Sequence, residues 1–171
     1  MKLRIRKSEF DDLAKIMEIY AFARDFMAKN GNPNQWGPTC WPPEALIRQD
    51  IENGHSYVCV NEKEEIIATF FFNQGKDIEP TYKNISQGSW KDSSPYGVVH
   101  RIAANGREKG TGSFCMNWAL EKCPHLRIDT HPDNIVMQNM LKKLGFEQCG
   151  IIHVEEDNYP RLAYEKSVSL P

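Results

Sequence analysis

Residues 98–112 of this 171-residue chain have the sequence VVHRIAANGREKGTG. The β-branched residues within Gly97 to Ala103 predict a strand, and Gly110 to Cys123 reads as a helix. Two glycines in the turn between them, Arg107 to Gly112, allow close approach to backbone N–H groups that have no partner inside the helix. Such N–H groups bind anions, so the segment predicts a phosphate-binding turn, with an ordinary tight turn as the alternative. The turn has neither the GxxxxGK[ST] pattern nor the GxGxxG pattern, which excludes two common nucleotide-binding loops.

The chain continues beyond this turn as alternating strands and helices. Leu126 to Thr130 predicts a strand, and the segment NIVMQNMLKKLGF at residues 134–146 predicts a helix that Gly145 ends. Phe146 to His153 and Arg161 to Glu165 predict two closing strands. The second half is therefore expected to be a βαβαβ-like unit followed by one more strand.

This half resembles the GNAT superfamily of N-acetyltransferases over Gly97 to Glu165. Arg107 to Gly112 fits the family's R/Q-x-x-G-x-G/A signature, and the later helix is similar to its N-x-x-A-x-x-L-Y-x-K-x-G-F pattern. The resemblance implies an α/β (α+β) fold in one GNAT-like domain, residues 1–171. We expect a mixed, mainly antiparallel sheet with helices on both faces and a parallel strand pair that splays near Ile102 and Asp129.

The resemblance also implies that acetyl-CoA binds as a co-substrate between the splayed strands. Strand backbone would contact the pantetheine arm at Ile102, Ala103 and Ala104. The turn and the helix start would surround the pyrophosphate with Arg107, Glu108, Lys109, Gly110, Thr111, Gly112 and Ser113. Asn134 would form a hydrogen bond with the pantetheine or on the acceptor side.

The first half agrees with the family only in the order of its elements. A short strand near Leu3 and Ile5 precedes a helix for which Ser8 is a candidate N-cap. A loop over residues 30–43, a helix at Glu44 to Glu52 and a hairpin over 56–72 follow. The long polar segment 73–95 is expected to be functional or mobile.

One residue of the helix pattern departs from the family. Leu141 lies where the family often carries a tyrosine that protonates the departing CoA thiolate. Leucine cannot donate a proton, and one general acid is worth roughly 10²–10⁴-fold in rate. Two hypotheses therefore remain: an acetyl-CoA-dependent N-acetyltransferase, and a GNAT-like module that binds acyl-CoA or another ligand without turnover.

Three residues are candidates for the proton transfer that an acetyl transfer to an amine requires. Strand alternation places His100 on the same face as Ile102, beside the expected cofactor, and histidine titrates near neutral pH. Asp129 and His131 share a face at the end of the next strand and form a second candidate cluster. Structural roles remain the alternative for all three, and we expect no metal site.

The acceptor pocket is expected to come from the first two helices and the loop after the third strand. Trp36, Tyr57 and Glu79 are its candidate residues, because aromatic walls and a carboxylate suit a cationic amine. Other residues of the same kind and region are Gln35, Trp41, Tyr82 and Trp90. A small amine, an amino acid and a protein N-terminus all remain possible acceptors.

Composition limits the other classes of function. Twenty-one basic and 23 acidic residues give a net charge of −2, with no basic run, so we expect no nucleic-acid partner. The five cysteines are widely spaced and include no CxxC pair, which argues against a disulfide framework or zinc site. Without a signal sequence or a membrane span, we expect a cytoplasmic monomer or homodimer.

We predict that Gly110→Asp abolishes CoA binding while the fold stays largely intact. The substitution places a carboxylate against the pyrophosphate and blocks the approach to the backbone. Calorimetric titration with CoA and a parallel melting curve measure the two effects. An unchanged CoA affinity would show that the turn is structural only.

Overall fold

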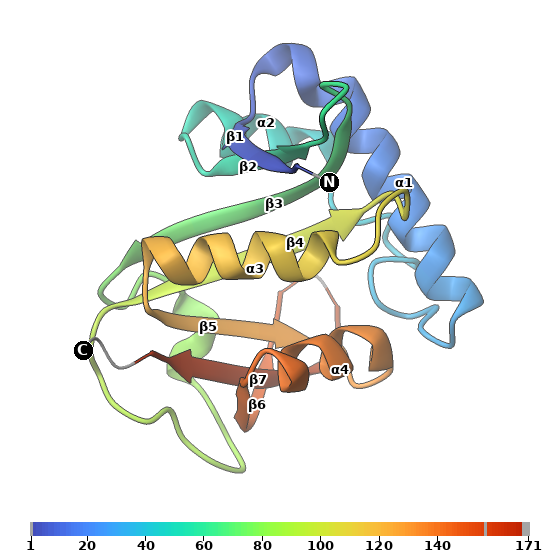
Figure 1. Cartoon of the computed structure of the whole chain (residues 1–171). Coiled ribbons are helices and arrows are strands. Elements are labelled where there is room, and N and C mark those ends of the chain that lie inside the picture. The colour runs from blue at the N-terminus through green and yellow to red at the C-terminus, as the bar shows by residue number, and fades with distance from the viewer. Residues whose placement is uncertain (1, 156, 169–171) are drawn as a thin grey trace.

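The computed structural model describes residues 2–155 and 157–168, so the two ends of the expected domain, residues 1 and 171, lie outside the described residues. Its main feature is a seven-stranded sheet in the order β1-β2-β3-β4-β5-β7-β6. The strands are β1 Arg4–Lys7, β2 Ser56–Val60, β3 Ile66–Gly75, β4 Tyr96–Ala104, β5 His125–Thr130, β6 Glu147–His153 and β7 Pro160–Ser167. Among the strands of the described residues, only β4 and β5 pair in parallel, which confirms the expected mixed, mainly antiparallel sheet (Figure 1).

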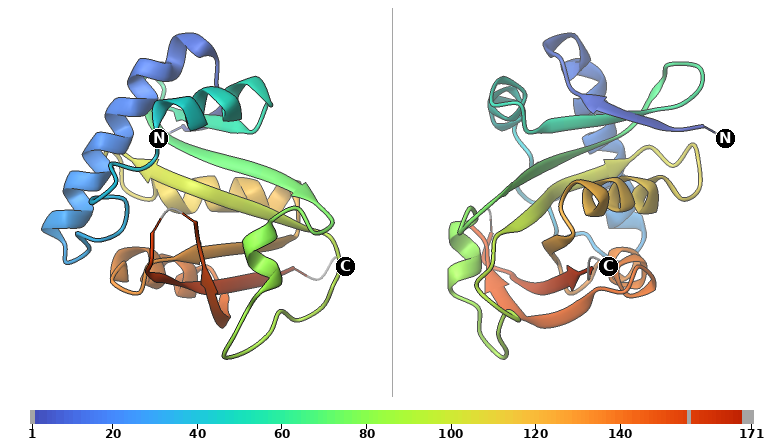
Figure 2. Two further views of the ribbon diagram at one scale, coloured as in Figure 1. Left: turned by 180° about the vertical axis from the view of Figure 1, so that it is seen from behind. Right: turned by 60° about the vertical axis from the view of Figure 1, so that its left-hand side comes forward.

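Helices cover both faces of this sheet, as the sequence predicts (Figure 2). The α-helices are α1 Leu13–Lys29, α2 Glu44–Glu52, α3 Thr111–Lys122 and α4 Ile135–Lys143, and the short 3₁₀ segments are η1 Phe10–Asp12 and η2 Pro80–Lys83. α1 and α2 bury Ile16, Ile47 and their neighbours against one face, around Val58. α3 and α4 pack on the other face, around Met116 and Leu141.

The start of the first helix differs from the prediction. Ser8 does not cap it, because its hydroxyl forms a 2.8 Å hydrogen bond with the hydroxyl of Ser56. The Asp12 carboxylate accepts a 2.7 Å hydrogen bond from the Glu9 N–H at the beginning of η1 instead. The short strand β1 is thus tied to β2 at the point where the chain turns into the helix.

The parallel strands β4 and β5 remain together over a very short distance. Their register contains only Gly97 opposite Leu126 and Val98 opposite Arg127, after which the strands diverge (Figure 1). Gly97 permits this contact, because an added Cβ would lie 2.7 Å from the Leu126 side chain. The remainder of β4 therefore has one edge that is not paired with β5.

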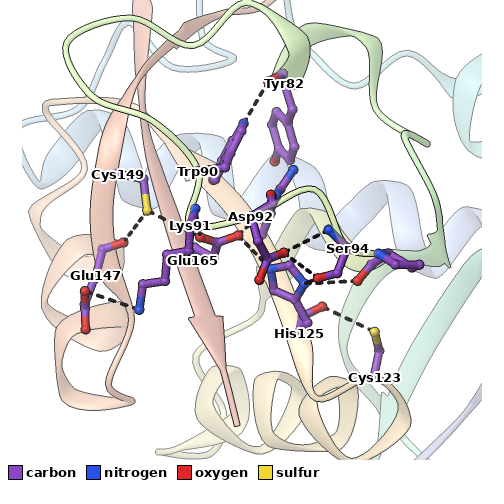
Figure 3. A network of polar contacts seen from close by, with 12 residues as sticks. Tyr82, Trp90, Lys91, Asp92, Ser94, Cys123, His125, Glu147, Cys149 and Glu165 are labelled. Carbon is purple, nitrogen blue, oxygen red and sulfur yellow. Dashed lines mark hydrogen bonds and ion pairs between the residues drawn. The ribbon is translucent and has the colours of Figure 1, made fainter. Parts of the chain in front are cut away.

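The segment between β3 and β4, expected to be functional or mobile, is tied to the sheet at several points. It contains η2 and a bridge between Ser86 and Ile151 of β6. The Trp90 indole N–H donates a 2.8 Å hydrogen bond to the Tyr82 carbonyl (Figure 3). The Lys91 N–H donates a 2.9 Å hydrogen bond to a Glu165 carboxylate oxygen on β7. These contacts fix η2, which brings Glu79 and Tyr82 beside β4.

Glu165 is the centre of this anchor. Its side chain is fully buried, and its second oxygen lies 2.6 Å from His125 Nε2 (Figure 3). The same oxygen lies 2.8 Å from Arg127 Nε. Arg127 also donates a 2.7 Å hydrogen bond to the Asp92 carbonyl, and its guanidinium lies 4.4 Å from the centre of the Trp90 ring. A buried carboxylate thus links β5, β7 and the β3–β4 segment, and it retains partners on each.

We predict that Glu165→Ala lowers the free energy of unfolding by about 3–5 kcal/mol, because it leaves Arg127 buried without its carboxylate. Burial alone would raise the pKa of Glu165, but the hydrogen bonds from His125, the Lys91 N–H and Arg127 lower it below the ordinary 4.5. The contribution is therefore complete above about pH 4.5 and is lost as pH falls through the lower folded-state value. Urea unfolding at pH 7 and pH 3 measures both effects.

The matched control is Glu147→Ala. Glu147 forms a 3.3 Å ion pair with Lys91, but its side chain is 69% exposed, so the loss should stay below about 1 kcal/mol. An equal loss in both variants would contradict the role given to Glu165.

Candidate active site

The divergence of β4 and β5 opens onto a cavity of about 560 Å³. Its lining comes from α1, the α1–α2 loop, α2, the start of η2, the ends of both strands, the N-terminal parts of α3 and α4, the β6–β7 turn and β7. The predicted residues that line it are Trp36, Glu79, His100, Ile102, Ala103, Ala104, Gly112, Asp129 and Asn134. The structure therefore brings the predicted cofactor residues of β4 to one place with two of the three catalytic and two of the three acceptor candidates, whereas most residues of the turn Arg107 to Ser113 lie outside the lining.

A β-bulge shapes β4 at the cavity. Arg101 has φ +51°, and two residues of β4 fit between the pairs Thr69–Ala103 and Phe71–His100 where β3 has one. The Tyr20 hydroxyl donates a 2.8 Å hydrogen bond to the Arg101 carbonyl. Asp50 of α2 accepts a 2.6 Å hydrogen bond from the Arg101 guanidinium. The two helices on this face thus hold the bulge in place.

The bulge corrects one step of the sequence argument. His100 and Ile102 do not share a face, because the extra residue interrupts the alternation between them. Ile102 packs with the α3 and α4 core, whereas His100 contacts the ring of Phe71 and the Tyr82 ring on the opposite face. Both residues nevertheless line the cavity.

His100 lies between two carboxylates. Its Nε2 is 2.8 Å from a Glu79 oxygen, and its Nδ1 is 3.9 Å from Asp129 Oδ2, which is too far for a hydrogen bond. The Tyr82 hydroxyl donates a 2.7 Å hydrogen bond to the same Asp129 oxygen. If Nε2–H donates to Glu79, Nδ1 is the ring nitrogen left to accept a proton in the cavity.

Glu79, predicted as an acceptor residue, has its carboxylate engaged with His100 and Thr81. Burial would raise its pKa, but the hydrogen bond and charge of His100 and two hydrogen bonds from Thr81 lower that pKa to about 2. The Glu79 carboxylate is therefore ionised at any pH used for an assay. Burial and the nearby Asp129 charge raise the pKa of the Tyr82 hydroxyl well above 10, so this hydroxyl keeps its proton.

His131, the third catalytic candidate, lies apart from this cluster. Its ring is 2% exposed, packs 5.1 Å from the Tyr159 ring, and does not line the cavity. Its Nδ1 accepts a 3.0 Å hydrogen bond from the Asp133 N–H. Burial and the charge of Arg161 lower the pKa of His131, which favours the neutral ring. The structure thus gives His131 a place in the turn before α4 and only Asp129 of this pair a place in the cavity.

The predicted phosphate-binding turn leads into α3 at the edge of the cavity. Gly110 precedes the helix with φ +80°, and an added Cβ there would meet nothing within 4 Å. The open space leaves the backbone accessible to an anion. An alanine at Gly110 would share the strain of the positive φ without adding charge, so Gly110→Ala is the matched control for the aspartate variant.

The other turn residues differ in exposure. Arg107 and Lys109 are exposed, whereas Thr111 is buried and its hydroxyl donates a 2.8 Å hydrogen bond to the Glu108 carbonyl. Ser113 is half-buried in the first turn of α3. The turn therefore has an exposed outer side with two cations and an inner side that fixes its shape.

Asn134 caps α4, because its side-chain oxygen accepts a 3.0 Å hydrogen bond from the Met137 N–H. Its amide nitrogen donates a 3.0 Å hydrogen bond to the Gln35 side chain. Gln35 in turn accepts one from Asn32. Asn134 thus joins α4 to the α1–α2 loop across the cavity.

The structure does not bring Tyr57 to the cavity. Its ring packs 4.9 Å from that of Trp118 on α3 and stacks on Phe70 at 5.6 Å. Val58, the next residue of β2, faces α1 and α2 instead. Because side chains alternate along a strand, Tyr57 belongs to the α3 face and not to the acceptor wall. Leu141 is fully buried in the same α3–α4 core.

Several cavity residues were not singled out from the sequence. Phe22 and Phe26 on α1 are 45% and 43% exposed, and Val136 on α4 is 56% exposed. The spacing of four between the two phenylalanines places them on one helix side, away from the buried stripe. That second apolar stripe is the signal that marks them in the sequence.

Within residues 2–155 and 157–168, no group of three His, Cys, Asp or Glu side chains is arranged to hold a metal ion. The helices in that part of the chain are all too short or too polar to cross a membrane.

Comparison with known proteins identifies relatives of the whole fold. A GNAT-family acetyltransferase of Streptococcus agalactiae is 30% identical, with a TM-score of 0.87 over 98% of this chain and 96% of its own. GNAT-family acetyltransferases of Listeria monocytogenes and Bacillus cereus share the fold at 16% identity each. Their TM-scores are 0.70 and 0.62, and the matches cover 97% and 99% of this chain and 95% and 100% of theirs.

Curated protein sequences give no significant match. The model of the acetyltransferase (GNAT) family matches residues 16–146, which is most of the chain. That region contains the diverging strands, the cavity residues His100 and Glu79, and the turn before α3. The chain therefore belongs to the acetyltransferase (GNAT) family of acyltransferases.

Proposed function

We propose that this protein transfers an acetyl group from acetyl-CoA to a primary amine by direct attack in a ternary complex. The observation that carries the proposal is the position of His100. Its ring is fixed by Glu79, lines the cavity at the point where β4 and β5 diverge, and keeps one nitrogen in a position to take a proton.

The chain has the groups that acetyl-CoA requires. The open backbone at Gly110 and the start of α3 suit the pyrophosphate, and the exposed cations Arg107 and Lys109 add positive charge nearby. The unpaired edge of β4, from Ile102 to Ala104, supplies backbone groups for the amide-containing pantetheine arm. Acetyl-CoA supplies the activated acyl carbonyl of a thioester.

The mechanism follows from the proton balance. An alkyl amine with a pKa near 10 is mostly protonated at neutral pH and cannot attack a carbonyl in that state. His100 accepts one proton from the ammonium at Nδ1, while the anionic Glu79 and Asp129 stabilise the positive ring. The amine attacks the thioester carbonyl, the C–S bond breaks, and the amine's second proton leaves. One of these protons neutralises the CoA thiolate and the other is released to solvent.

Leu141 is the observation that favours the second candidate function, binding without turnover. It is buried and cannot protonate the thiolate. In the proposed enzyme, protonated His100 supplies that proton directly or through water, so the tyrosine is not needed. Acetyl-CoA-dependent release of CoA thiol with a panel of amines distinguishes the two functions, since a binding module releases none.

We predict that kcat/KM rises with pH as the acceptor and the base lose protons, and that His100→Ala lowers it by about 10²–10⁴-fold and flattens the profile. Glu79→Gln lowers the height of the profile without removing a limb between pH 5 and pH 10, because the pKa of Glu79 is about 2. CoA release followed spectrophotometrically against pH measures both effects.

His153→Ala is the matched control, because His153 is exposed on β6 and does not line the cavity. CoA binding measured by calorimetry shows whether each variant retains the folded cofactor site. A His100→Ala profile equal to that of the wild type in height and shape would remove His100 from the mechanism.

A further inference from the structure

One wall of the cavity is apolar and comes from α1, the α1–α2 loop and α2. It consists of Phe26, Trp36, Trp41 and Leu46. Trp36 has φ +67°, a region that costs a non-glycine residue about 1–2 kcal/mol. The loop holds this conformation through a 3.0 Å hydrogen bond from the Trp41 N–H to the Trp36 carbonyl and an edge contact at 5.8 Å with the Tyr20 ring. The loop part of this wall, Trp36 and Trp41, is therefore held in place by contacts within the protein.

The charged groups of the cavity are biased toward negative charge. Three carboxylates line it, from Glu79, Asp129 and Glu155. The two arginines of the lining are each paired with a carboxylate of the protein. Arg101 lies 2.6 Å from Asp50, and Arg161 lies 2.7 Å from Asp157.

These pairs determine which acceptor charges the cavity favours. An ammonium group beside Glu79 and Asp129 gains charge-assisted hydrogen bonds. A carboxylate on the carbon next to the amine would lie within a few ångströms of the same two oxygens and be repelled. Both arginines of the described lining already share their charge with an aspartate, so neither Arg101 nor Arg161 offers that carboxylate an uncompensated positive charge.

We propose that the acceptor is a primary amine with an apolar, preferably aromatic body and without a carboxylate beside the amine. This inference rests on the proposed acetyl transfer. The ammonium group binds at Glu79 and Asp129, within reach of His100, and the body lies along the Phe26, Trp36 and Trp41 wall. α-Amino acids are excluded by their carboxylate, and short polar amines bind weakly because they leave this wall in contact with water.

The test compares three acceptors with the full-length protein at saturating acetyl-CoA. 2-Phenylethylamine has both expected features, L-phenylalanine adds only a carboxylate, and ethanolamine lacks the ring. We expect kcat/KM for 2-phenylethylamine to be roughly 100-fold higher than for L-phenylalanine. It should also be at least about tenfold higher than for ethanolamine.

Two pairs of variants locate the effect in the cavity. Phe26→Ala should raise KM for 2-phenylethylamine several-fold and leave KM for ethanolamine unchanged. The control Phe10→Ala, at a phenylalanine that is 53% exposed and outside the cavity, should change neither KM. Glu155→Lys should lower kcat/KM for 2-phenylethylamine and raise it for L-phenylalanine. The control Glu62→Lys, on the exposed β2–β3 turn, should change kcat/KM for neither acceptor.

The outcomes separate the two proposals. Equal kcat/KM for 2-phenylethylamine and L-phenylalanine, or for 2-phenylethylamine and ethanolamine, overturns the acceptor class and leaves acetyl transfer standing. Acetyl transfer itself is overturned if calorimetry still shows acetyl-CoA binding but no CoA is released with these acceptors or with a wider panel of amines and peptides.

Discussion

The short pairing of β4 with β5 is the constraint on which the rest of the structure depends. Two residue pairs, beginning at Gly97 and Leu126, hold the parallel strands together before they diverge. The cavity exists because backbone beyond these pairs is left without a partner strand. The bulge at Arg101 then rotates the following stretch of β4, so that His100 contacts Phe71 and Tyr82 on one face and Ile102 packs with the α3–α4 core on the other. His100 and the backbone of Ile102 to Ala104 thus reach the cavity from opposite faces of one bulged strand.

Each side of this opening is held by its own buried polar contacts. Tyr20 and Asp50 fix β4 from the helical layer, and both bond to the backbone or the side chain of Arg101. Glu165 fixes β5 and the β3–β4 segment from within the sheet. Polar groups buried in this way are costly unless all their partners are present, which makes the geometry of the opening specific as well as stable. The long β3–β4 segment, which the sequence predicts to be functional or mobile, is consequently tied to the sheet and holds Glu79 beside β4.

The sequence predicts the elements well wherever local chemistry determines them. The helix at Glu44 to Glu52 and the strand at Ser56 to Val60 have their predicted bounds, because proline, asparagine and glycine mark their ends. The turn before α3 is equally well predicted, because its two glycines indicate a turn without reference to the rest of the fold.

The sequence does not predict the bulge at Arg101, because tertiary contacts hold a non-glycine residue in the left-handed conformation there. Simple alternation consequently gave His100 the wrong neighbour. The sequence predicts Tyr57 for the acceptor pocket from its aromatic ring and its region alone, because nothing local reveals that α3 covers its face. The pairing of Glu79 with His100 joins residues 21 apart through an irregular segment, and no periodicity reports such a contact.

The two halves of the sheet meet along a seam of two residue pairs, so the width of the cavity depends directly on the angle between the halves. A molecule that binds to both strands would take the place of the missing backbone partners and hold the two halves of the sheet together. Binding of such a molecule would therefore raise the free energy of unfolding by an amount that depends on its concentration relative to its Kd.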